Sequence, residues 1–99
     1  MALSLTAFID SLESAAPPDT LDAPLNALWW GGKQQWEKAH AEVNHANGPE
    51  AAWVHAWLHR WEGDRTNAAY WYRRAGRPMK EGDPEKEWRE ITSALLDAG

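Results

Sequence analysis

The stretch from Gly48 to Arg74 places the strongest constraint on the fold of this 99-residue chain. It reads G-P-E-A-A-W-V-H-A-W-L-H-R-W-E-G-D-R-T-N-A-A-Y-W-Y-R-R, and it holds four of the eight tryptophans and two of the four histidines. Pro49 favours the start of a helix, because the backbone N–H that proline lacks has no partner in a first helical turn. Glu50 complements the positive end of the helix dipole. Gly63 suits the left-handed residue that closes a helix, and Asp64 suits the cap of the next helix. The stretch therefore predicts a tight helical hairpin.

The first helix of this hairpin divides into an apolar arc and a polar stripe. The arc is wider than a surface helix needs, and it comprises Ala51, Trp53, Val54, Trp57, Leu58 and Trp61. His55, His59 and Glu62 form a narrow stripe beside it, at positions i, i+4 and i+7. Because little of the circumference is left for water, we expect a central helix whose two histidines are at least partly buried.

The remaining sequence adds helices on both sides of the hairpin and no credible strand. Apolar residues recur at helical spacing in each segment, and glycine and proline pairs interrupt the pattern. The expected helices span residues 4–16, 24 to the Gly31-Gly32 pair, 34–46, 49–62, 65–75 and a last stretch from Pro84 onward. Short connections favour antiparallel neighbours. We expect one all-α domain over residues 1–99, a compact bundle with core hairpins at 24–76 and with the first and last helices covering its ends.

Composition excludes several classes of protein. The chain has no cysteine, so disulfides, thiolate metal ligands and thiolate nucleophiles are impossible. Its formal charge of −5 disfavours nucleic-acid binding, which needs many lysines and arginines. The N-terminal stretch lacks a basic signal-peptide region, and no apolar run approaches the length of a membrane span. We expect a soluble cytoplasmic protein without nucleic-acid or membrane partners.

An internal repeat accompanies the hairpin. The helices expected at 34–46 and 65–75 share a pattern at a constant offset. Ala39, Val43 and Ala46 of the first correspond in position to Ala68, Tyr72 and Ala75 of the second. Together with Gly63, the second set matches the second-helix spacing of tetratricopeptide repeats, and G-D-R-T-N-A-A-Y-W-Y-R-R-A-G resembles the related Sel-one-like repeats. The resemblance implies two tetratricopeptide-like hairpins and, as in other repeats of this kind, protein or peptide partners.

A closer resemblance covers residues 25–78. The run H-A-W-L-H-R-W-E-G-D-R-T-N-A-A-Y-W-Y-R-R-A-G, with W-E-K-A-H upstream, resembles a family of small bacterial and fungal proteins that has no assigned activity. This chain departs from the family at Gly31-Gly32-Lys33, where the relatives have Gly-Asp-Trp. It also departs from the repeat pattern, because large apolar positions of the repeat's first helix fall on His55 and His59. The resemblance implies a fold and supplies no function.

The histidines could hold a metal ion. His55 and His59 lie one turn apart and can reach a single ion, with Glu62 as a third ligand or as an acceptor behind a ligand. His40 could complete the set, because its helix should pack against the central one. Imidazole and carboxylate ligands without thiolate suit zinc, iron or manganese. The alternative is that these histidines are packing residues, hydrogen-bonded to Glu62, Asn67 or backbone.

The helix expected at 65–75 has a polar face of its own. Asn67, Tyr70, Trp71 and Arg74 lie within two turns and can hydrogen-bond to, and stack on, a ligand or an extended peptide. The alternative is that Tyr70 and Trp71 belong to the core and that Arg74 pairs with an acid such as Glu62 or Asp64. The sequence leaves both alternatives open.

Two hypotheses of function follow from these patterns. The first is a non-enzymatic binding module for a protein, peptide or small molecule. Its polar groove, set in a tryptophan-rich core, would be lined by His40, His55, His59, Glu62, Asn67, Tyr70, Trp71 and Arg74. The second is a metal-dependent enzyme or metal-binding protein that uses His40, His55, His59 and Glu62. Nucleophilic catalysis has little support, because no serine or threonine lies in a nucleophile motif.

Overall fold

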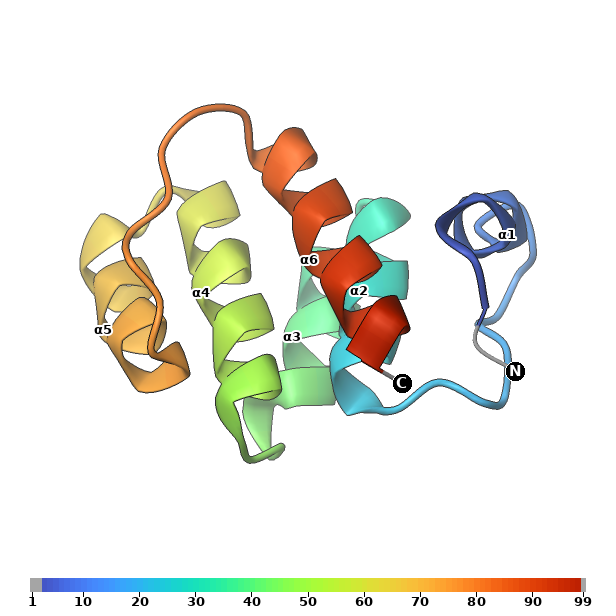
Figure 1. Ribbon diagram of the computed structural model, residues 1–99, viewed down its shortest axis with the longest axis horizontal. Helices are drawn as coiled ribbons and strands as arrows, with labels where there is room; N and C mark the ends of the chain where they lie inside the picture. The colour runs from blue at the N-terminus through green and yellow to red at the C-terminus, as the bar shows by residue number, and fades with distance from the viewer. Residues whose placement is uncertain (1–2, 99) are drawn as a thin grey trace.

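The computed structural model describes residues 3–98, and this part of the chain folds into six α-helices and contains no strand (Figure 1). The helices are α1 (Leu5–Ser11), α2 (Ala23–Gly32), α3 (Trp36–Asn44), α4 (Pro49–Glu62), α5 (Arg65–Ala75) and α6 (Pro84–Ala98). The expected all-α class is confirmed. Within residues 3–98, no helix has both the length and the apolar character that crossing a membrane requires.

α4 lies at the centre of the molecule. It packs against α2, α3, α5 and α6, and every residue from Ala51 to His59 is buried. The cause is its wide apolar arc, because tryptophan and leucine side chains around most of a helix need neighbours on several sides. Figure 1 shows α5 on one side of α4, α3 and α2 on the other, and α1 at the far end.

The turn between α4 and α5 forms as its residues predict. Gly63 has a φ of 92°, in the left-handed region that glycine adopts without strain. The Asp64 carboxylate accepts the backbone N–H of Asn67 at 3.1 Å and so caps α5. α5 then packs back along α4, with Ala68 and Tyr72 buried.

α2 ends at Gly32, as expected, and both glycines lie in its last turn. Their role is close packing. A Cβ on Gly31 would lie 2.8 Å from the Trp57 ring, and one on Gly32 would lie 2.9 Å from the Trp88 ring. The chain turns after α2 at Gln34, whose φ is 64°. α3 consequently begins at Trp36 rather than at residue 34, and it ends at Asn44 rather than at residue 46.

The first helix is also shorter than expected, ending at Ser11 rather than at residue 16. The Ser11 hydroxyl donates to the Phe8 carbonyl at 2.6 Å and accepts the Trp29 indole N–H at 3.0 Å. The end of α1 is thereby fixed to α2, and Phe8 is fully buried in the core.

A buried polar network fixes α6 against α4 and α5. Glu87 is only 2% exposed, and its carboxylate accepts hydrogen bonds from the Arg60 guanidinium at 2.8 Å and from the Tyr72 hydroxyl at 2.6 Å. Burial, and next the hydrogen bond to Glu87, raise the pKa of Tyr72, so its hydroxyl stays protonated and donates. The Trp88 indole N–H donates to the Leu28 carbonyl and ties α6 to α2 as well. α6 therefore covers the side of α4 that carries Arg60.

Candidate metal centre

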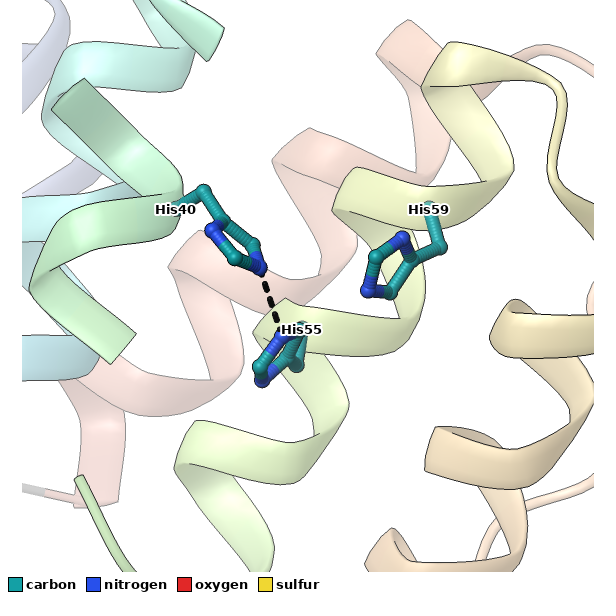
Figure 2. Close-up of side chains that lie close together, drawn as sticks. All are labelled: His40, His55 and His59. Atoms are coloured by element: carbon teal, nitrogen blue, oxygen red, sulfur yellow. Dashed lines mark hydrogen bonds between the residues drawn. The ribbon is translucent and has the colours of Figure 1, made fainter. Parts of the chain in front are cut away.

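Three imidazole rings from two helices point toward one another, with α6 lying behind α4 in this view (Figure 2). His40 comes from α3, and His55 and His59 come from successive turns of α4. One ring nitrogen of each lies within 4.8 Å of the other two. The Nε2 atoms of His40 and His55 are 3.0 Å apart. We call these three residues the histidine cluster.

Helical periodicity and helix packing bring the three rings together. The i, i+4 spacing places His55 and His59 on one stripe of α4. α3 packs against α4, and the Trp36 indole N–H donates to the Leu58 carbonyl of α4 at 2.8 Å. Trp36 also stacks on His40, with ring centroids 4.8 Å apart. Because Trp36 and His40 lie one turn apart on α3, the hydrogen bond to Leu58 helps to position the His40 ring.

α5 contributes a wall to the cluster through Trp71. The Trp71 indole lies nearly parallel to the His55 imidazole, with ring centroids 3.9 Å apart and an angle of 9° between the planes. The His55 ring is also close to parallel with the His59 ring, at a centroid distance of 5.1 Å. These stacked contacts limit the rotation of the His55 ring and hold its Nε2 atom toward His40.

Glu62 fixes the proton of His59. The Nδ1 atom of His59 lies 2.7 Å from Oε1 of Glu62, and a carboxylate at this distance accepts the proton of that nitrogen. In the neutral imidazole the other nitrogen, Nε2, then carries the lone pair. Metal-binding histidines commonly have such a carboxylate behind them, since it fixes the tautomer and makes the ligand nitrogen more basic.

The pKa values of two of the histidines favour neutral rings. Burial is the largest cause that lowers the pKa of His55, and the neighbouring rings of His40 and His59 add to it, so that the pKa falls to about 4. Burial and then the proximity of His59 lower the pKa of His40, against a smaller opposing effect of Glu62. At neutral pH both rings are therefore uncharged and keep a lone pair for bonding.

The structure brings together three of the four residues proposed as metal ligands, His40, His55 and His59, and it places Glu62 behind His59. The rest of the expected groove is distributed around them. Trp71 contacts His55, whereas Tyr70 and Arg74 are exposed beside it on α5. Asn67 is directed to the start of α5, where its side-chain amide donates to the Asp64 carboxylate at 2.9 Å. It therefore serves the helix cap rather than the cluster.

Arg74 does not have the partner that the packing alternative gave it. Its Nη1 donates to the Tyr70 hydroxyl at 3.0 Å, and its Cζ lies 5.3 Å from the centroid of the Trp71 ring. Within residues 3–98, no carboxylate forms an ion pair with it. Tyr70 is 42% exposed and is not a core residue, while Trp71 is partly buried.

Two residues near the cluster were not recognised as parts of a site from the sequence. The spacing of Trp36 could have indicated its role, because a residue four positions before His40 lies on the same face of the helix. Asp64, expected as a helix cap or as an acid partner of Arg74, lies with Glu62 and His59 in a second group of ligand atoms within 4.8 Å of one another. Its carboxylate already accepts two hydrogen bonds from Asn67, so it is the weaker candidate as a ligand.

Comparisons with protein-family models, with curated proteins and with solved structures return no match to this chain. The function is therefore argued from the geometry of the histidine cluster alone.

Proposed function

We propose that the protein binds one divalent transition-metal ion, zinc in the first place, through His40, His55 and His59. The observation that carries the proposal is the convergence of three ring nitrogens within 4.8 Å. Zinc binds imidazole nitrogen at about 2.0–2.1 Å in tetrahedral geometry, which separates two ligand nitrogens by about 3.3 Å. The 3.0 Å between the Nε2 atoms of His40 and His55 is close to this separation. Small rotations of the rings complete the set.

The distribution of protons and lone pairs on the ring nitrogens of the cluster also supports the binding of an ion. If the short contact between His40 and His55 is a hydrogen bond, only one of the two Nε2 atoms carries a proton. The proton of His59 is on Nδ1, toward Glu62, so its Nε2 faces the cluster with a lone pair. An additional proton would place positive charge among buried rings, which the lowered pKa of His55 opposes. A divalent cation that displaces the proton between His40 and His55, to Nδ1 or to water, accepts all three lone pairs at once.

The ligand set favours a site with an exchangeable position over a closed structural site. Closed structural zinc sites have four protein ligands, whereas sites with three histidines keep a position for water or a substrate. Glu62 does not fill that position, because its carboxylate lies at Nδ1 of His59 and is not grouped with His40 and His55. Bound water on zinc loses its proton near neutral pH, so this arrangement can supply a hydroxide for hydrolysis or hydration. A metal-dependent activity is thus the function that the geometry supports best; iron or manganese are the other candidate ions.

Metal analysis of the purified, tag-free protein tests the proposal. We expect one zinc ion per chain after incubation with zinc and removal of excess by gel filtration. The variant His55→Ala should lose the ion. His45→Ala is the matched control, because His45 is exposed at the end of α3 and lies outside the cluster, and it should keep the ion. His40→Ala, at a less buried position, repeats the test if His55→Ala fails to fold. Equal zinc content in all four proteins would refute the proposal.

A second candidate is a non-enzymatic, tetratricopeptide-like interaction module. It is favoured by the pairing of α2 with α3 and of α4 with α5, by the complete burial of the small residues Ala39 and Ala68, and by the exposure of Tyr70. In this case the groove on α5 binds its partner without an ion. Thermal-shift screening of peptides and small molecules in the presence of a chelator tests it. A ligand that stabilises the wild type but not Arg74→Ala supports the module, and a screen without any such ligand counts against it.

A further inference from the structure

Arg74 stands at the rim of the histidine cluster. Its Cζ lies 5.3 Å from the Trp71 ring, and that ring lies 3.9 Å from the His55 ring. The guanidinium is therefore within about 9 Å of the imidazole whose nitrogen faces the proposed ion. The Trp71 indole lies between the two groups and contacts both.

The guanidinium of Arg74 is held in place but has no carboxylate partner among residues 3–98. Its Nη1 donates to the Tyr70 hydroxyl, and it lies against the faces of Tyr70 and Trp71. Within residues 3–98, Arg60 and Arg65 have carboxylate partners, Glu87 and Glu81, whereas Arg74 has an aromatic one. A guanidinium stacked on aromatic rings keeps its remaining N–H donors free, and these suit the bidentate binding of carboxylate or phosphate.

The charge balance of the proposed centre also favours an anion in its open position. Three neutral histidines leave both positive charges of a divalent ion uncompensated by its direct ligands. Glu62 offsets one of these charges from behind His59. Asp64, the other acid of the second ligand group, is already bonded to Asn67. An anionic group in the open position supplies the missing charge.

We propose that the centre binds a small dianion with two oxyanion groups, one on the metal ion and the other on Arg74, with its carbon chain against Trp71. The inference rests on the proposed metal function. An extended four-carbon dicarboxylate has the length to contact an ion at the cluster with one carboxylate and the Arg74 guanidinium with the other. A monocarboxylate reaches one of the two groups only. The second oxyanion can be a carboxylate or a phosphate, because a guanidinium fork accommodates both.

Cobalt(II) is the probe for this inference, since its visible absorption reports the coordination of the ion. The protein is loaded with cobalt and titrated with acetate, succinate and 3-phosphonopropionate. The titrations are repeated on Arg74→Gln and on the control Arg73→Gln, which removes the same charge from a neighbouring exposed position of α5. We expect at least one of the two dianions to bind roughly tenfold or more tightly than acetate, because a charge-assisted bidentate contact adds to the bond with the ion.

The two variants decide the outcome. Loss of the preference for dianions in Arg74→Gln, with its retention in Arg73→Gln, supports the inference, and the stronger of the two dianions identifies the second group as carboxylate or phosphonate. Equal binding of acetate and both dianions, or equal loss in both variants, overturns it. A normal cobalt spectrum that no anion changes overturns this inference and leaves the metal function standing. Absence of any cobalt spectrum refutes the metal function itself.

Discussion

Lowering the pH should destabilise the metal-free protein through His55 in particular. Burial and the neighbouring imidazoles depress the pKa of His55 from its usual 6.5 to about 4 in the folded state. Between these two values the unfolded chain binds a proton at this residue that the folded protein does not. The contribution of His55 to stability is therefore complete above pH 6.5 and is lost as the pH falls toward 4. By pH 4.5 the loss amounts to about 2.5 kcal/mol.

The groups that face His55 set the sign of this effect. The centroids of the His40 and His59 rings lie 4.8 Å and 5.1 Å from that of His55. A positive charge on either ring repels one on His55 and so lowers the pKa of His55. Trp71 covers one face of the ring and keeps water away. Glu62 is bonded to His59 rather than to His55. No neighbour therefore offsets the cost of charging the His55 ring.

Urea unfolding followed by circular dichroism measures the effect, with a chelator present and the pH stepped from 7.5 to 4.5. Wild type and His55→Gln are compared, with the exposed His45→Gln as control. The carboxylates titrate alike in all three proteins, so their contribution cancels. The free energy of unfolding of the wild type should fall by about 2.5 kcal/mol more than that of His55→Gln, and His45→Gln should follow the wild type. Parallel curves for the wild type and His55→Gln would show that His55 is not held neutral.

Four further substitutions test the site and the packing around it. Glu62→Gln should weaken zinc binding by about 10- to 100-fold in a competition titration, because it removes the carboxylate behind His59. Glu87→Gln should cost about 3–5 kcal/mol in urea unfolding, since it leaves a buried guanidinium without its counter-charge. Glu90→Gln, in a half-exposed ion pair, should change the same free energy by about 1 kcal/mol or less. Gly31→Ala should cost about 1–3 kcal/mol, because its Cβ would lie 2.8 Å from the Trp57 ring; an unchanged unfolding midpoint would show that the ring simply moves aside.

The parts of the fold that local chemistry determines could be predicted. The hairpin of α4 and α5 depends on Gly63 in the left-handed region and on Asp64 as a cap, and both features are encoded within a few residues. α5 begins and ends at the expected residues for the same reason. The central position of α4 follows from its apolar arc, which no surface helix could bury.

Features that depend on distant contacts could not be predicted. The sequence indicates the end of α2 at Gly31-Gly32, but it does not show that Trp57, 26 positions further along, packs directly on Gly31. The buried pair of Arg60 and Glu87 joins α4 to α6, and nothing in the local spacing of either residue indicates the other. A helical pattern shows which face is apolar, but not which other helix covers it.

The candidate site shows the same division. The stripe of His55, His59 and Glu62 is fixed by helical periodicity and could be predicted as a group. The direction of the His40 ring could not, because it depends on the contact of Trp36 with α4. The loss of Asn67 from the groove also escaped prediction, because the Asp64 side chain competes for its amide.

The position of the cluster between two hairpins links the proposed ion to the stability of the fold. Two of its ligands belong to α4, and the third, His40, belongs to α3 of the other hairpin. An ion that binds only the folded protein at a thousandfold its Kd adds about 4 kcal/mol to the free energy of unfolding. In a domain of this size that raises Tm by roughly 15 °C or more. In His40→Ala the ion no longer joins the hairpins, so the rise in Tm with zinc should fall by more than half. Hydrogen exchange should show added protection of α3 by zinc in the wild type and not in this variant. If zinc protects α4 alone in both proteins, the ion is held by one helix and His40 is not a ligand.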